Sequence, residues 1–289
     1  MVVGYNEEKL LPACLQAISF CDDIHYTDLG STDGSVKVAE QFAQNIYQRD
    51  PVPSCEMIQT EVVDYTKNDW VIFVDPDEVV DDTLATEIIN RFEELTAQQE
   101  VGAIKVPWQF YFKSTRLRGT VWGGKNQKFF LVNKHRFAFD PVVHYGRKLK
   151  TGFTSTTIEL NKAETNVLHH YWMNSWKIFI RKHRRYLINE GIDRYNIGTR
   201  TSFKEVVLSP YYEFKISFWT LKGYKDGLLG LFLSAFWAWY QTSAMLSLYK
   251  IQKRKTLQAL LRLTVMIEII IATMPLAKFF VFEFYTTIT

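Results

Sequence analysis

A short apolar run that ends in a cluster of acids constrains the fold of this chain more than any other feature. Residues Trp70–Val74 are all apolar, which is typical of a β-strand buried on both faces of a parallel sheet. Asp75-Pro76-Asp77-Glu78 follows directly. Open α/β sheets bind ligands beyond the carboxyl ends of their strands, and two carboxylates there can converge on Mg²⁺ or Mn²⁺. The alternative is a solvated acidic loop that caps the next helix.

Strands and helices are expected to alternate around this run. Helical patterns cover residues 7–20, 35–43, 82–98 and 174–190. Strands are expected at residues 2–3, 24–28, 46–48, 69–74, 103–113, 127–133 and 166–170. This alternation predicts an α/β fold with a mostly parallel sheet flanked by helices. A hydrophobic content of 47% excludes a disordered chain.

Two further polar loops follow expected strands. Asp28-Leu29-Gly30-Ser31-Thr32-Asp33-Gly34-Ser35 opens a helix, where glycine permits close backbone approach and N–H groups can meet an anion. Taken alone, the segment favours an ordinary turn with Ser31 or Asp33 as a helix cap over a ligand site. Val3-Gly4-Tyr5-Asn6-Glu7-Glu8, taken alone, is merely a helix start.

Together the three loops, in this order, strongly resemble glycosyltransferase family 2. That resemblance implies an inverting enzyme of the GT-A fold that uses a nucleotide-diphospho-sugar and Mg²⁺ or Mn²⁺. A later segment, Leu221-Lys222-Gly223-Tyr224-Lys225-Asp226-Gly227-Leu228-Leu229-Gly230, is similar to one in bacterial members that extend lipopolysaccharide core or other envelope glycans. A nucleotidyltransferase, the other reading of this fold class, is disfavoured because the first loop lacks a Gly-rich, basic sequence.

The resemblance also implies roles for individual residues. Asp77 would hold the metal together with Asp75, which would also face the ribose or sugar. Glu78 would support the site and is counted with the catalytic candidates. The residues expected to contact the nucleotide-sugar donor are Val3, Tyr5, Asn6, Glu7, Asp28, Ser31, Asp33, Asp75 and Lys128, with Lys128 and Lys125 placed to meet its diphosphate.

The catalytic base is expected in the segment Asp140-Pro141-Val142-Val143-His144-Tyr145-Gly146. An inverting transfer needs a carboxylate or an imidazole to deprotonate the acceptor hydroxyl. Tyr145 stands where relatives carry a glutamate, which leaves Asp140 and His144 as candidates. Two alternatives stay open: a phosphate acceptor that needs no base, and a catalytically inactive homologue that acts as a membrane-bound partner in glycan assembly.

Charge is divided unevenly along the chain, although the formal net charge is only +3. Residues 1–100 contain 21 acids and 5 bases, and residues 101–289 contain 10 acids and 29 bases. The bases cluster before and between two apolar stretches, at 227–249 and 263–284. We expect these stretches to form monotopic or re-entrant helices in the inner leaflet, with true spans and soluble packing as alternatives.

These patterns divide the chain into a GT-A domain at residues 1–172 and a helical region at 173–289. A glycan or lipid-linked acceptor at the cytoplasmic face of the cell membrane, a bacterial inner membrane, is the expected setting. The start of the chain predicts no signal peptide, and three cysteines without metal-ligand spacing favour a reducing compartment. No nucleic-acid motif is present, so nucleic acid is not an expected partner.

Overall fold

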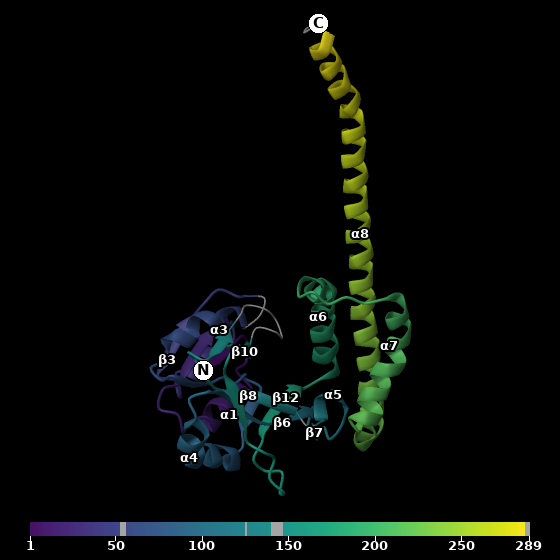
Figure 1. Ribbon diagram of the computed structural model, residues 1–289. Helices are drawn as coiled ribbons and strands as arrows, with labels where there is room; N and C mark the ends of the chain where they lie inside the picture. Colours follow the sequence, from purple (N-terminus) through teal and green to yellow (C-terminus); the bar gives the residue numbers. More distant parts are fainter. Residues whose placement is uncertain (53–55, 125, 140–146, 287–289) are drawn as a thin grey trace.

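The computed structural model describes residues 1–52, 56–124, 126–139 and 147–286, which form an α/β body and a layer of long helices (Figure 1). The amino terminus lies within the α/β body, whereas the carboxyl terminus lies at the far end of the longest helix. The α/β fold class expected from the sequence is therefore confirmed.

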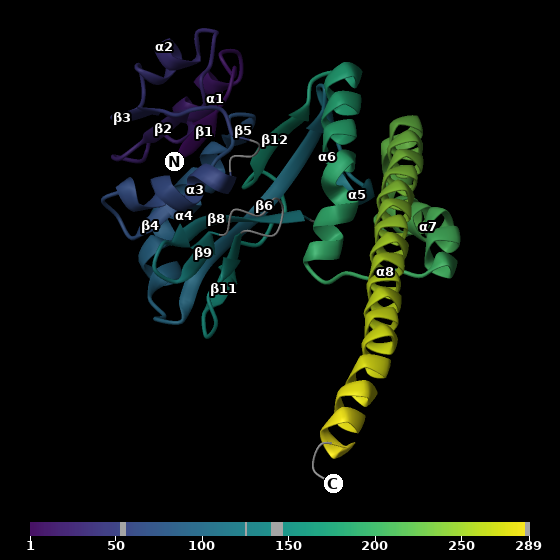
Figure 2. The ribbon, with the colours of Figure 1, turned by 90° about the horizontal axis from the view of Figure 1, so that it is seen from above.

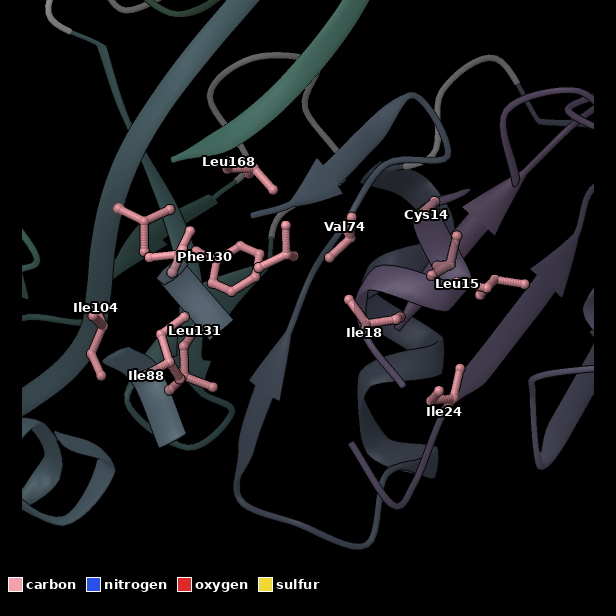
Figure 3. Packing of buried hydrophobic residues seen from close by; sticks show 14 of the residues in the cluster. Cys14, Leu15, Ile18, Ile24, Val74, Ile88, Ile104, Phe130, Leu131 and Leu168 are labelled. Carbon is pink, nitrogen blue, oxygen red and sulfur yellow. The ribbon is translucent and has the colours of Figure 1, made fainter. Parts of the chain in front are cut away.

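A small parallel sheet occupies the amino-terminal side of the body. It contains β1 (Val2–Gly4), β2 (His25–Asp28) and β3 (Asn45–Gln48), and β1 pairs with β2 in the register Gly4↔Asp28. The helices α1 (Leu11–Ala17) and α2 (Ser35–Ala39) connect these strands. Figure 3 shows Cys14, Leu15 and Ile18 of α1 in the same buried cluster as Phe130 and Leu131 of the larger sheet.

The larger sheet has seven strands and is mixed rather than mostly parallel. Its central order is β4 (Trp70–Ile72), β8 (Asn126–Asn133), β6 (Val101–Phe112), β12 (Leu168–Met173) and β5 (Glu78–Val80). The remaining two strands, β7 (Thr115–Arg116) and β11 (Thr154–Thr157), both pair with β6. Parallel pairing joins β6 to β12 and to β11, but β8 runs antiparallel to both of its neighbours, β4 and β6.

Residues 73 and 74 join the two sheets. The predicted strand 69–74 is assigned as β4 only to Ile72, because the chain then changes partners: Phe73 N–H donates to Phe130 O and Val74 N–H donates to Met1 O. Val74 also forms an isolated parallel bridge with Val2. The chain at Val74 therefore runs in the same direction as β1 and β2.

The first helix begins four residues later than expected. The backbone N–H groups of Asn6, Glu7 and Glu8 donate to side chains of the neighbouring loop, at Ser31, Ser35 and Asp33 respectively. Asn6 also adopts a left-handed conformation with φ 56°, which no α-helix accommodates. Residues 5–10 therefore form a loop and not the first turns of a helix.

Shorter elements complete the body. Helix α4 (Asp82–Thr96) begins at an N-cap in which Asp81 accepts from the Thr83 N–H, and its Leu84 and Ile88 enter the core. The other elements are α3 (Glu56–Val62), a 3₁₀ turn at Val63–Tyr65, α5 (Thr120–Gly123), and the antiparallel pair β9 (Phe137–Phe139) and β10 (Arg147–Leu149).

Three helices form the carboxyl-terminal layer seen in Figures 1 and 2: α6 (Trp176–Asn196), α7 (Phe203–Lys215) and α8 (Gly227–Thr286). A π-helical segment at Ile216–Thr220 and a 3₁₀ turn at Gly223–Asp226 link α7 to α8. Two separate apolar helices were expected here, but α8 is a single helix because its basic connector, residues 250–255, contains no glycine or proline. Across the part of the chain that the structure describes, no helix is both long and apolar enough to cross a membrane.

The Gly-Tyr-Lys-Asp-Gly segment fastens this layer to the body. The Asp226 carboxylate accepts the N–H groups of Arg118 and Gly119 at 2.7 and 2.8 Å. A Cβ on Gly119 would lie 2.1 Å from the carbonyl oxygen of Lys222, so only glycine permits this approach. Next to the junction, the rings of Trp122 and Trp237 meet edge to face.

Candidate functional site

Three polar loops leave the same edge of the sheets. Gly4 and Asp28 are register partners at the ends of β1 and β2, and Val74 runs parallel to β1 through its bridge with Val2. Parallel strands that end together release their following loops on one side of the sheet. The loops beginning at Tyr5, Leu29 and Asp75 therefore start as neighbours, as the strand-end motifs predicted.

Hydrogen bonds hold the first two loops together. Asn6 donates its N–H to Ser31 Oγ and accepts the Thr32 N–H at Oδ1, each at 2.8 Å. Glu7 N–H donates to Ser35 Oγ at 2.8 Å. Asn6, Ser31 and Asp33, all predicted donor contacts, thus also shape the loops that would surround a nucleotide.

Asp28 organises the second loop from within. Its side chain is buried, and Oδ2 accepts the N–H groups of Gly30 and Ser31 at 3.1 and 2.9 Å. The Tyr26 hydroxyl donates to Oδ1 at 3.3 Å. Gly30 has φ 79°, a conformation that favours glycine and turns the backbone sharply.

The third loop contains a buried ion cluster. Lys128 Nζ lies 3.1 Å from Asp75 Oδ2 and also hydrogen-bonds Glu78 Oε2, while Arg147 Nη2 lies 4.0 Å from Asp75 Oδ1. Burial would raise the pKa of Asp75, but the cations of Lys128 and Arg147 hold that pKa well below its usual range. Burial raises the pKa of Glu78 in spite of Lys128, and Glu78 Oε1 is buried without a hydrogen-bond partner.

These contacts turn Lys128 away from the expected diphosphate contact and give Glu78 a supporting position instead of a catalytic one. Lys128, expected to meet the diphosphate, is 7% exposed and is engaged by two carboxylates. Glu78 is fully buried and accepts the Asp75 N–H at 2.9 Å, so it holds the loop and does not face an acceptor. The carboxylates of Asp75 and Glu78 are thus paired with a cation of the protein itself.

Asp77 is paired with a histidine from another strand. His170 Nε2 lies 3.4 Å from Asp77 Oδ2, and the Asp77 carbonyl accepts the Tyr171 N–H. The His170 ring stacks on Trp108 with 5.0 Å between centroids, which fixes its orientation. His169, as its strand position predicts, points the other way and contacts Asp81 and Tyr111.

A divalent cation fits Asp77 and His170 better than it fits Asp75. One carboxylate and one imidazole suit Mn²⁺ when substrate phosphates and water complete the coordination, whereas Asp75 is already paired with Lys128. His170 Nδ1 is buried without a partner. Within the described residues, no group of three or more acidic, histidine or cysteine side chains forms a ready metal cage. The pair is therefore an incomplete set that phosphates would complete.

Glu7 lies near the third loop. Burial, followed by the neighbouring negative charge of Asp77, raises the pKa of Glu7 to about 7, and the ammonium of Lys182 on α6 acts in the opposite direction. Glu7, Asp77 and Lys182 of α6 are thus electrostatic neighbours. This arrangement gives the basic α6 a link to the site that charge counting alone did not predict.

The remaining predicted residues divide into two groups. Val3 is buried in the core, and Tyr5 is 51% exposed beside the Asn6 turn. Lys125 and the segment with Asp140, His144 and Tyr145 lie outside the described residues. The sequence did not predict a role for Arg147 or the pairing of His170 with Asp77. Strand pairing between β5 and β12 brings His170 and Asp77 together.

A mixed α/β fold with an acidic loop after β4 is the arrangement expected of the GT-A class. The model of the family "Glycosyl transferase family 2" matches residues 1–206. The chain belongs to this family and is a glycosyltransferase.

Several solved structures resemble this chain at low sequence identity. The mannosyltransferase PcManGT from Pyrobaculum calidifontis, solved with GDP-Man and Mn²⁺, is 12% identical over 86% of this chain and 85% of that chain, with a TM-score of 0.50. Glucosyl-3-phosphoglycerate synthase from Mycobacterium tuberculosis, solved with Mn²⁺, UDP and phosphoglyceric acid, is 14% identical over 70% and 78%, with a TM-score of 0.44. S. aureus TarS is 11% identical over 78% of this chain and 45% of that chain, with a TM-score of 0.40. The match thus spans less than half the length of that TarS chain.

Proposed function

We propose that this glycosyltransferase moves a hexose, with inversion, from a UDP- or GDP-sugar to a cell-envelope glycan or lipid-linked acceptor. The single observation that carries the proposal is the convergence of three strand-end loops, with Asp28, Asp77 and Glu7, at one edge of the sheets. Membership of family 2 supports glycosyl transfer, and the relatives solved with GDP-Man or UDP support a nucleotide-linked donor.

The first two loops would hold the nucleoside. Asp28 fixes the backbone at Gly30 and Ser31, and the bonds between Asn6 and residues 31–32 keep both loops in register. A loop that is ordered before the ligand arrives loses less entropy on binding. Tyr5 is exposed at this edge, where its ring can stack on a base.

Asp77 and His170 would hold Mg²⁺ or Mn²⁺. A bound cation offsets the negative charge of the departing diphosphate. Asp75 would face the ribose or sugar, and its contact with Lys128 keeps it ionised. Lys128 and Glu78 would act on the donor indirectly, by fixing the position of Asp75.

The acceptor hydroxyl would lose its proton to Asp140 or His144, both outside the described residues. Glu78 is unsuited to this step because it is fully buried and bound to Lys128. General-base catalysis requires a group within hydrogen-bond reach of the proton that it removes. A phosphate acceptor would need no such group. Loss of both Asp140 and His144 would therefore stop transfer to a hydroxyl acceptor but not transfer to a phosphate acceptor.

We place this reaction at the cytoplasmic face of a bacterial inner membrane. Residues 227–267 contain five bases, Lys250, Lys253, Arg254, Lys255 and Arg262, and no acid. A basic helix rich in exposed leucine and aromatic residues favours an anionic lipid surface. Lipid-linked and envelope acceptors are found at such a surface.

Incubation with a panel of UDP- and GDP-sugars, Mn²⁺ and membrane lipid extract tests the proposal through release of the nucleoside diphosphate. We expect one sugar nucleotide to be consumed, with an inverted anomeric configuration in the product by NMR. Asp77→Asn should abolish this consumption, whereas the surface variant Glu93→Gln on α4 should retain it. Equal turnover by the Asp77 variant would contradict the assignment of the metal to Asp77. A product with retained anomeric configuration would contradict the inverting mechanism.

A further inference from the structure

The outer side of α8 forms one continuous exposed stripe. Leu228, Ala235, Trp239, Leu246 and Leu257 are all exposed, and at about 100° per residue they fall within about 40° of one line along the helix. Leu228 is 85% exposed and Trp239 is 51% exposed. The line runs for about 44 Å at 1.5 Å per residue. We call these five residues the α8 stripe.

The rest of the molecule leaves this stripe uncovered. Trp237, about 180° around the helix from Leu228, contacts Trp122 of α5. Phe236 meets Phe179 of α6 on one flank, and Ser234 meets Ser217, next to α7, on the other. The stripe therefore faces away from the α/β body, between the sides of α8 that α6 and α7 occupy, and Figure 2 shows these three helices in one layer.

The charge around the stripe selects among possible partners. The ionised residues of 227–267 are five bases, and no acid accompanies them. At about 100° per residue, Lys253 lies on the line of the α8 stripe, and Lys250 and Arg254 lie about 40° and 80° from it. The other two, Lys255 and Arg262, lie on the opposite side of α8. A second copy packed along the same helix would bring two such rows of like charge together, which is unfavourable. In an anionic bilayer, leucine and tryptophan side chains can enter the acyl layer while lysine ammonium groups contact the negative headgroups. The long aliphatic part of lysine lets its ammonium reach the headgroups from the acyl layer.

The amino-terminal end of the stripe has further features of an interface. Trp219 and Tyr224 are exposed and lie 6.1 Å apart between ring centroids, with Lys222 and Lys225 exposed beside them. Tryptophan and tyrosine favour the boundary between headgroups and acyl chains. The Asp226 carboxylate hydrogen-bonds the backbone of Arg118 and Gly119. The orientation of α8 on a membrane would therefore set the orientation of the α/β body.

We infer that α8 lies flat on an anionic lipid bilayer along the α8 stripe, instead of touching the membrane only through its far carboxyl-terminal end. This inference rests on the proposed membrane location and names the surface that makes the contact. A flat helix holds the catalytic body at a fixed distance from the bilayer, with the body on the opposite side of α8. An end-on helix would leave that distance and the orientation of the body free.

Flotation of the full chain with vesicles tests the inference without donor or acceptor. Wild type should float with phosphatidylcholine vesicles that contain phosphatidylglycerol and float poorly with phosphatidylcholine alone. Trp239→Glu/Leu246→Glu should bind at least tenfold more weakly, because two apolar side chains no longer enter the acyl layer and two negative charges are added. The matched pair Ile89→Glu/Ile188→Glu, on exposed sites of α4 and α6, should bind as wild type.

A second measurement does not depend on a charged variant. Brominated phosphatidylglycerol should quench wild-type tryptophan fluorescence, and Trp239→Phe should lose part of that quenching while Trp70→Phe should not. Equal flotation of the stripe variant, or unchanged quenching in Trp239→Phe, would overturn the inference. Loss of self-association in the stripe variant with unchanged flotation would instead assign the stripe to a second copy. Nucleotide binding, measured separately, reports on the proposed function and is expected to be unaffected.

Discussion

His170 and Asp77 form a pair across two strands, with 3.4 Å between Nε2 and Oδ2. Antiparallel pairing of β12 with β5 aligns His170 with Glu78, which places its ring next to the loop that holds Asp77. Trp108 stacks against the opposite side of this arrangement and limits rotation of the imidazole. This is the pair to which we assign the divalent cation in the proposed reaction.

His170→Phe should weaken Mn²⁺ binding by about tenfold or more, because an aromatic ring is kept and the nitrogen is lost. Electron paramagnetic resonance of free Mn²⁺, in the presence of UDP or GDP, measures this directly. His169→Phe is the matched control, since its ring lies on the other face of the same strand. Equal Mn²⁺ affinity in both variants would rule out His170 as a ligand.

Lys128→Met should lower the free energy of unfolding by about 3–5 kcal/mol, because the buried carboxylate of Glu78 and the partly exposed carboxylate of Asp75 lose their shared cation. Adding Glu78→Gln should recover part of the loss, since one of the two charges is removed. Urea unfolding measures both effects, with exposed Lys162→Met as the control. A small effect of Lys128→Met would mean that water or another cation replaces it.

Glu7→Gln should stabilise the metal-free protein at pH 8 and have little effect at pH 4.5. The pKa of Glu7 rises on folding to about 7 through burial and Asp77, so the folded state binds the extra proton more tightly. Its contribution to stability is present at low pH and is lost as pH rises through about 7. Thermal unfolding across this pH range tests the sign, and a stabilisation that is equal at both ends would contradict it.

Asp226→Ala should destabilise the protein by about 1–3 kcal/mol, because the N–H groups of Arg118 and Gly119 lose their charged acceptor. Hydrogen exchange should accelerate at residues 118–124, where the helical layer joins the body. Asp193→Ala on the exposed side of α6 is the control. Unchanged exchange at the junction would show that the aromatic contacts between Trp122 and Trp237 suffice to hold it.

Local patterns predicted the fold more fully than they predicted the side-chain partners. The edge of the sheet could be identified from the apolar run 70–74 and the polar loops after Val3, Asp28 and Val74. A buried strand and the loop that follows it are adjacent in sequence, so a local pattern shows both. The expected strand at 166–170 is likewise found, and its alternation turns His169 and His170 to opposite faces. These features depend on few residues close in sequence.

Partners distant in sequence could not be predicted in the same way. Lys128 was expected at the diphosphate, yet it neutralises Asp75 and Glu78 because β8 and the metal loop meet only in the folded chain. The bonds from residues 6–8 to the loop at 31–35 likewise replaced the predicted helix start. Periodicity carries no information on such contacts.

Calorimetric titration of UDP and of GDP in the presence of Mn²⁺ tests the donor site most directly. The account predicts that wild type binds one of these nucleotides, that omission of Mn²⁺ weakens the binding, and that Asp77→Asn weakens it to a similar extent while Glu93→Gln does not. Absence of binding by either nucleotide, or binding that is equally tight without Mn²⁺ and in Asp77→Asn, would contradict it.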